Sequence, residues 1–171
     1  LEYIELTGTQ YIDTGYKTKA PTEIEMDFSA DASSKWIFGS RSSSSNSDSF
    51  GVYLNSSTQY WARIGGNTDN AAHRLNNVNT IGRHKIYATS SSFTQDNISS
   101  INYTADSTQG SYNLYIGTMN SGGTVDNRMF VGKIYSFKIL EGNDLVRKFV
   151  PCLRKKDNEE KLFALRNEVE S

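Results

Sequence analysis

A strict alternation of apolar and acidic residues near the N-terminus constrains the fold of this chain more than any other feature. The segment 22–28 alternates without interruption. Its apolar residues are Ile24, Met26 and Phe28, and its acidic residues are Glu23, Glu25 and Asp27. Because successive side chains of a β-strand point to opposite faces of the sheet, this pattern predicts a strand with one buried face and one solvated face.

Short segments of similar character recur along the 171 residues, separated by polar turns that contain glycine, asparagine and aspartate. This spacing is typical of an antiparallel β-sandwich or barrel. We predict strands over residues 2–6, 9–13, 22–28, 35–39, 50–54, 58–64, 84–89, 98–103, 112–117, 128–131, 133–140 and 145–150. Since short predicted strands separated by polar turns continue on both sides of the serine-rich segment 40–49, we expect a single domain over residues 1–171. That segment is then a mobile surface loop rather than a linker.

The balance of charge argues against two classes of partner. The chain has 18 Lys and Arg residues, 19 Asp and Glu residues and a net charge of −1 at pH 7. A protein that mainly neutralises phosphates would carry an excess of basic residues, so we expect no nucleic-acid binding. The longest apolar run is residues 162–165, which is too short to cross a bilayer, so we expect no membrane insertion.

The cysteine content and the N-terminal sequence bear on the cellular context. One cysteine, Cys152, can form no intrachain disulfide, which favours a bacterial or phage protein over a secreted eukaryotic domain. No signal peptide opens the sequence, which begins at Leu1, and we therefore expect a fragment of a longer protein.

Several segments together resemble a domain common in phage structural proteins and bacterial surface proteins. The opening residues 1–15 resemble the start of that domain, and later segments resemble its subsequent parts in order. These later segments are residues 37–41, 50–53, 113–117, 132–139 and 145–152. The family belongs with the concanavalin A-like and laminin-G-like jelly rolls. The resemblance implies an all-β fold, a two-sheet antiparallel jelly-roll sandwich.

The same resemblance implies a function and a location. Such domains are appended to phage tails and cell-surface proteins, where their presumed role is lectin-like adhesion. We therefore expect a non-catalytic module that binds carbohydrate or a host-surface receptor, at the virion or bacterial surface, with a possible homo-oligomer inside a larger assembly. The first alternative is a structural or interaction domain of a tail fibre without a small ligand. The second is a glycoside hydrolase of the same fold.

The C-terminal stretch allows two interpretations. Family members form a further strand where this chain has residues 161–164, so the resemblance favours a strand. However, Leu162, Leu165 and Val169 follow Asp157 at the spacing of an amphipathic helix.

Aromatic residues on two adjacent predicted strands suggest a ligand site. Alternation places one set of side chains in the core, namely Phe50, Val52, Leu54, Tyr60, Ala62 and Ile64. Tyr53, Trp61 and Arg63 then face outward. An exposed Trp61 and Tyr53 would suit stacking of a sugar ring, with Arg63 and Asn55 as hydrogen-bonding groups. The alternatives are that the opposite face is buried or that a loop such as 40–49 covers the rings.

The acidic residues of segment 22–28 also suggest an enzyme. Retaining endoglucanases of this fold carry carboxylates on alternate strand positions in the order Glu, Asp, Glu, whereas this chain has Glu23, Glu25 and Asp27. The outer two would lie about 13 Å apart on a regular strand. A retaining mechanism needs about 5–5.5 Å between its two carboxyl groups. We therefore expect exposed surface carboxylates and no catalytic residues.

No cofactor is expected, although calcium is possible. Oxygen donors cluster around Asp69 and around Asp126, in segments 67–70 and 126–127, without the spacing of an EF-hand loop. His73 and His84 stand in no recognised metal-site or triad spacing.

Overall fold

A computed structural model of the chain describes residues 1–42, 48–65, 73–104, 109–153 and 160–165. The regular elements in these ranges are all strands. They are β1 (Ile4–Thr7), β2 (Ile12–Lys17), β3 (Thr22–Ala30), β4 (Lys35–Arg41), β5 (Phe50–Ser56), β6 (Gln59–Ile64), β7 (His73–Asn76), β8 (Gly82–Ala88), β9 (Ser92–Gln95), β10 (Ser99–Asn102), β11 (Asn113–Ile116), β12 (Met119–Ser121), β13 (Thr124–Val125), β14 (Val131–Glu141), β15 (Asp144–Leu153) and β16 (Glu160–Leu165).

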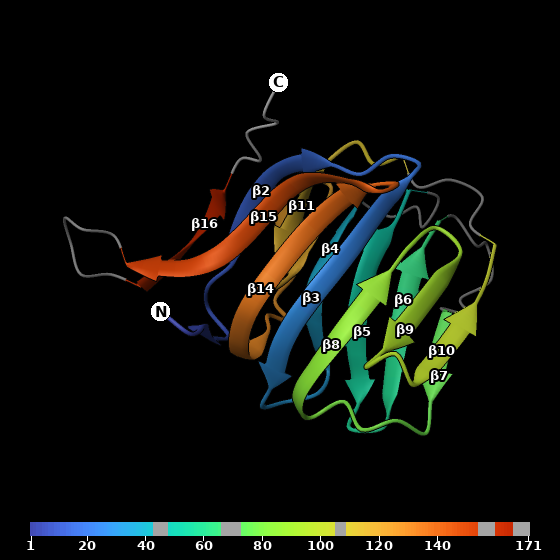
Figure 1. The fold of residues 1–171 in the computed structure, drawn as a ribbon, viewed down its shortest axis with the longest axis horizontal. Coiled ribbons are helices and arrows are strands. Elements are labelled where there is room, and N and C mark those ends of the chain that lie inside the picture. The colour runs from blue at the N-terminus through green and yellow to red at the C-terminus, as the bar shows by residue number, and fades with distance from the viewer. Residues whose placement is uncertain (43–47, 66–72, 105–108, 154–159, 166–171) are drawn as a thin grey trace.

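The strands form two sheets stacked face to face (Figure 1). The first, called the β3 sheet, has the order β10-β9-β8-β3-β14-β15-β16, and β1 also pairs with β14. The second, called the β5 sheet, has the order β13-β12-β4-β5-β6-β7, and β11 joins β2 to β4. Pairing is antiparallel apart from the short parallel pair of β12 with β4 and one parallel bridge. The predicted all-β, two-sheet sandwich is confirmed.

The core lies between the two sheets and contains the residues that alternation predicts. On β3, Ile24, Met26 and Phe28 are buried, as the pattern of segment 22–28 requires. Phe38 of β4 packs edge-on against Phe137 of β14, with ring centroids 5.4 Å apart. The inward-facing residues predicted for β5 and β6 are all buried. Burial of this apolar surface is the main stabilising contribution to such a sandwich.

Three predicted segments differ in the structure. The strand predicted over residues 9–13 starts later, at Ile12, because the chain first turns at Gly8, whose φ is 87°. The Thr7 amide donates a hydrogen bond to the Gln10 side chain in this turn. Residues 128–130 form no strand, since only Met129 makes a bridge, to Trp36. Segment 40–49 begins as strand, with Ser40 buried in β4, and its residues 43–47 lie outside the described part.

The C-terminal ambiguity is resolved in favour of a strand. β16 pairs antiparallel with β15, with Leu165 opposite Lys148 and Glu160 opposite Leu153. The helix that the local spacing suggests is therefore wrong, because a neighbouring strand edge offers backbone hydrogen bonds that the pattern of a single segment does not reveal. No helix capable of spanning a bilayer is found in the part of the chain that the structure describes.

Candidate functional site

The outer face of the β5 sheet presents two rows of side chains that run across its strands. In one row, Trp36 pairs with Tyr53, which pairs with Trp61, which pairs with Arg74. In the next row, Gly39 pairs with Gly51, which pairs with Arg63. Gly51 and Arg63 stand two residues from Tyr53 and Trp61, and the β-bulge in β4 puts Gly39 three residues from Trp36. Side chains two residues apart share a face, so both rows point away from the core. We call this surface, together with Met119 and Arg128, the aromatic–arginine face.

A small apolar cluster forms the floor of the aromatic–arginine face. Trp36, Tyr53 and Met119 are buried together, with Trp61 packed against them. The ring centroids lie 4.8 Å apart for Trp36 and Tyr53 and 5.8 Å apart for Tyr53 and Trp61. Contact between rings at these separations is favourable, and it fixes the orientation of each ring.

The two glycines of the second row make room for Met119. A Cβ atom on Gly39 would lie 2.6 Å from Met119 Cε, and one on Gly51 would lie 2.9 Å from the same atom. Gly51 is tighter still against the backbone, because its Cβ would lie 2.8 Å from the carbonyl oxygen of Phe38. The glycines therefore let a flexible apolar side chain lie flat on the sheet, between the aromatic row and Arg63.

Three guanidinium groups lie against these rings. Arg63 and Arg74 each stand with Cζ 5.3 Å from the centroid of the Trp61 ring. Arg128 stands 5.3 Å from the Tyr53 ring and 5.6 Å from the Trp36 ring. Cation–π contacts of this kind are individually modest, but they hold long side chains in defined positions.

One carboxylate faces this group of arginines. Asp126 accepts two hydrogen bonds from the Arg128 guanidinium, one from Nε at 2.9 Å and one from Nη2, and a third from the Arg128 backbone amide at 2.9 Å. Although burial raises the pKa of Asp126, the hydrogen bonds and charge of Arg128 lower it overall. The same hydrogen bonds to Asp126 raise the pKa of Arg128. The pair is therefore ionised at neutral pH and cancels its own charge.

The remaining arginines are not neutralised in this way. A further arginine, Arg41, stands two residues after Gly39 on β4 and so shares its face. Within the described ranges, Arg41, Arg63 and Arg74 form no ion pair with a carboxylate. The Nε atom of Arg63 is buried without a hydrogen-bond partner in that same part of the chain. Burial, and then the charges of Arg41, Arg128 and Arg74, lower the pKa of Arg63. Positive charge thus accumulates on a half-buried surface, which favours a bound anion.

The four residues that the sequence suggests for a ligand site all lie on or beside this face. Trp61 and Arg63 point outward and are half-buried. Tyr53 also points outward, but the expectation that it is exposed is wrong, since only 7% of its surface is accessible. Trp36, Met119 and Arg128 cover it. Tyr53 therefore serves as floor rather than as a stacking surface.

Asn55 lies at the border of the face and is engaged in an amide network. Its Nδ2 donates to Gln59 Oε1 at 2.6 Å, and Trp61 Nε1 donates to the same oxygen at 2.6 Å. Gln59 in turn donates to Asn76. This network orients the Trp61 indole, so the contribution of Asn55 is to position that ring.

Sequence reasoning misses Trp36, Arg74, Arg128 and Met119. A β-bulge between Trp36 and Phe38 sends both Ile37 and Phe38 into the core, so simple alternation assigns Trp36 to the wrong face. Arg74 stands on β7, a strand of four residues that was not predicted. Arg128 and Met119 reach the face only through long-range pairing, and no local signal marks them.

Of the two calcium candidates, only Asp126 lies among the described residues. Asp69 lies outside the described residues. Asp126 is bound to Arg128, so a cation at this carboxylate would have to displace a two-point ion pair. The described ranges contain no group of three or more His, Cys, Asp or Glu residues placed to hold a metal ion.

The three acidic residues of β3 are separately engaged on the other sheet. The Tyr87 hydroxyl donates to Glu23, Lys138 pairs with Glu25 at 2.6 Å, and Arg83 pairs with Asp27 at 3.0 Å. β3 pairs with β8 without a bulge, so no local shortening brings the outer two together. The expectation that these residues are fully exposed is wrong, because all three are half-buried. The Asp27 side chain is only 12% exposed beneath Arg83, whereas that of Glu25 is 43% exposed.

Comparison with known proteins identifies the class of fold. No family model and no curated protein sequence matches the chain. Among solved structures, it is similar to the Ruminococcus gnavus IT-sialidase CBM40 bound to α2,3-sialyllactose, with a TM-score of 0.61 and 14% identity over 82% of this chain and 90% of that one. It is also similar to a mutant of the NanB sialidase from Streptococcus pneumoniae, with a TM-score of 0.63 and 14% identity over 82% of this chain but only 26% of that one. The fold is thus a β-sandwich of the kind found in these modules.

Proposed function

We propose that this chain is a non-catalytic carbohydrate-binding module whose aromatic–arginine face binds glycans that carry a carboxylate. The observation that carries the proposal is the group of three arginines, Arg41, Arg63 and Arg74, without a carboxylate partner in the described part of the chain. A guanidinium binds a carboxylate through two parallel hydrogen bonds, which gives both affinity and orientation.

We propose a different role for each residue of this face. Arg63 and Arg74 supply the hydrogen bonds to the carboxylate, and Trp61, which touches both, holds them in place. Since burial, and then the neighbouring arginines, lower the pKa of Arg63, a bound anion would relieve the repulsion between these like charges. The accessible part of the Trp61 ring would contact the carbon face of the sugar, and the buried Met119 would support that ring from below.

The comparisons with solved structures support this proposal. The Ruminococcus gnavus module is bound to α2,3-sialyllactose, an acidic trisaccharide, and this chain covers 90% of that module. We therefore propose a sialylated glycan as the first ligand to test. Because each contact is weak, we expect a modest affinity, about 0.1–1 mM, which is about 4–5.5 kcal/mol.

The setting that best fits such an affinity is a surface that presents many copies. We propose that the parent protein belongs to a phage tail or a bacterial surface and that the module acts outside the cell, on carbohydrate or on a host receptor that bears it. Multiple copies in one assembly would add avidity of about 10²–10⁴.

Titration calorimetry with 3′-sialyllactose and lactose tests the proposal. These two sugars share the lactose part and differ in the sialic acid, so lactose is a matched neutral control. We expect binding of sialyllactose alone, about tenfold weaker after Arg63→Ala or Arg74→Ala. Arg147→Ala, on β15 of the other sheet, should leave the affinity unchanged.

Two results would contradict the proposal. The first is equal binding of lactose and sialyllactose. The second is the absence of binding by either sugar up to about 10 mM, well above the expected dissociation constant. The second result would instead favour a structural or interaction domain without a small ligand.

A further inference from the structure

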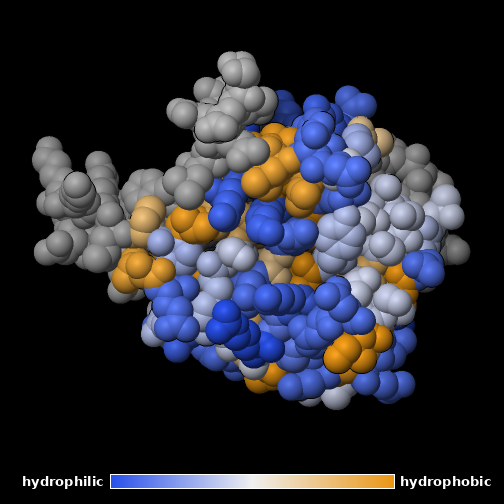
Figure 2. Space-filling model, viewed as in Figure 1, coloured by the Kyte–Doolittle hydropathy of each residue, from blue (hydrophilic) through white to orange (hydrophobic). Residues whose placement is uncertain are grey.

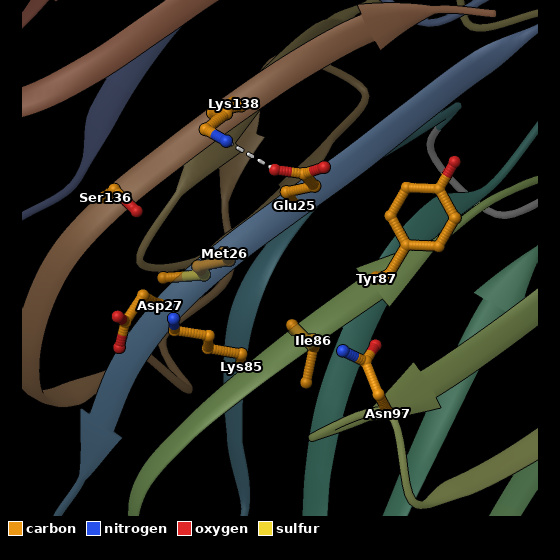
Figure 3. A pocket seen from close by; sticks show the side chains of 9 residues that line it. All are labelled: Glu25, Met26, Asp27, Lys85, Ile86, Tyr87, Asn97, Ser136 and Lys138. Atoms are coloured by element: carbon orange, nitrogen blue, oxygen red, sulfur yellow. Dashed lines mark hydrogen bonds and ion pairs between the residues drawn. The ribbon is translucent and has the colours of Figure 1, made fainter. Parts of the chain in front are cut away.

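A hollow of about 450 Å³ lies on the opposite side of the molecule, on the outer face of the β3 sheet. Figure 2 shows this side of the molecule, where hydrophilic residues predominate and small apolar areas lie between them. The hollow extends over β8, β3 and β14 and is bordered by Asn97 in the turn between β9 and β10 (Figure 3). Its volume is within the range of about 300–1,000 Å³ that small-ligand sites occupy.

Strand register explains why the surface is hollowed at this place. Lys85, Asp27 and Ser136 form one row across β8, β3 and β14, and Tyr87, Glu25 and Lys138 form the next. A β-bulge in β14 between Ile134 and Ser136 brings the small Ser136 side chain into the first row. A short side chain flanked by longer ones leaves a depression. Figure 3 shows Tyr87 and Ser136 on opposite sides of it.

The four charged side chains that line the hollow balance in number, with the carboxylates of Glu25 and Asp27 and the ammonium groups of Lys85 and Lys138. Glu25 pairs with Lys138 at 2.6 Å, and Asp27 accepts two hydrogen bonds from Arg83, at 3.0 and 3.1 Å. Lys85 is the lining cation without an ion-pair partner among the described residues. An anion would therefore meet two carboxylates, and a cation would meet two ammonium groups. The lining does not favour a charged ligand of either sign.

The polar groups and the ring of Tyr87 suit an uncharged polyhydroxylated ligand. Lys85 and Asn97 can donate hydrogen bonds, Glu25 and Asp27 retain acceptor lone pairs, and the Ser136 hydroxyl can do both. The Tyr87 hydroxyl donates to Glu23, which fixes the ring at the edge of the hollow before any ligand arrives. A rigid ring with alternating donors and acceptors beside it is the arrangement that recognises a sugar.

We propose that this hollow is a second saccharide site, which takes an uncharged sugar residue on the face opposite the aromatic–arginine face. The chain would then have two sites on opposite sheets, with different selectivity for charge. This inference does not depend on the proposed acidic-glycan site, because the two sites share no residue.

Nuclear magnetic resonance titration of the whole chain tests the inference residue by residue. The probes are the methyl glycosides of glucose, galactose, mannose and N-acetylglucosamine, each added to about 50 mM, so that even a dissociation constant near 10 mM is detected. We expect at least one of them to shift the backbone signals of Lys85, Tyr87 and Ser136 while those of Trp61 and Arg63 stay in place.

Three variants make the test specific. Ser136→Leu fills the hollow and should weaken binding about tenfold or more. Tyr87→Phe keeps the ring but loses the hydrogen bond to Glu23, so it should bind less tightly than the wild type and more tightly than Ser136→Leu. Lys17→Ala, at an exposed position of β2 in the other sheet, is the control and should bind the neutral glycoside as the wild type does.

The outcomes separate this inference from the proposed function. Absence of shifts around the hollow with all four glycosides would overturn the inference, whatever sialyllactose does at Arg63. Unchanged affinity of a folded Ser136→Leu variant would overturn it as well. Sialyllactose failing to shift Trp61 and Arg63 would contradict only the acidic-glycan proposal.

Discussion

The outer faces of the two sheets are both formed by β-strands, but they differ in whether their charged side chains have partners of opposite charge. On the β3 sheet, Glu25 and Asp27 each have a basic partner on an adjacent strand. On the aromatic–arginine face, Arg128 pairs with Asp126, two residues before it, whereas Arg63 and Arg74 have no acidic partner in the described ranges and lie against Trp61 instead. The comparison indicates that an unneutralised cluster, rather than the number of charges, is what marks a surface for a charged ligand.

Reversing the charge of two arginines on the aromatic–arginine face should have the largest effect on ligand binding. In the double variant Arg63→Glu and Arg74→Glu, two donors become repulsive carboxylates, so we expect binding of sialyllactose to weaken at least about 100-fold, or about 2.7 kcal/mol. Calorimetry measures the loss, and circular dichroism verifies the fold. Retention of more than a tenth of the affinity would show that the carboxylate binds elsewhere.

The glycine pair beneath Met119 allows a matched test of how the aromatic–arginine face is built. Gly51→Ala should lower the free energy of unfolding by about 1–3 kcal/mol, because its Cβ would meet backbone atoms that do not yield. Gly39→Ala should cost less, since its nearest neighbour is the flexible end of Met119. Denaturant titration compares the two. Adding Met119→Ala should relieve the strain of Gly39→Ala but not that of Gly51→Ala, and equal costs would refute this account.

Salt should distinguish the two faces without mutation. Raising the salt concentration from about 0.05 to 0.5 M screens exposed charges and should weaken sialyllactose binding severalfold. Binding of a neutral glycoside at the hollow should change little over the same range. Parallel titrations at the two salt concentrations measure both changes in affinity. An equal loss of affinity for the two ligands would contradict the expected difference between the two faces.

The smallest effect is expected for the carboxylate of Glu25. Its side chain is 43% exposed and pairs with Lys138, so Glu25→Ala should change the free energy of unfolding by about 0.5 kcal/mol or less. Asp27→Ala should cost more, because Asp27 is largely buried under Arg83. Chemical denaturation of both variants measures the difference. A large loss of stability in Glu25→Ala alone would mean that the pair of Glu25 with Lys138 has a structural role that its exposure does not suggest.

Much of the fold follows from patterns within single segments. Alternation of period two gives the buried face of β3, and it assigns the inward residues of β5 and β6 correctly. It also places Tyr53, Trp61 and Arg63 on one outer face. These inferences succeed because the direction of a side chain in a regular strand depends only on its position along that strand.

Tertiary structure decides what the alternation leaves open. The bulge at Trp36 turns that ring outward, and pairing across the sheet brings Arg74 next to Trp61. The C-terminal strand exists because β15 offers it an edge, although its own spacing fits a helix. Sequence alone thus determined which side of each regular strand is apolar. Register and bulges decided which cations have no acidic partner among the described residues, because both depend on pairing between segments far apart in the chain.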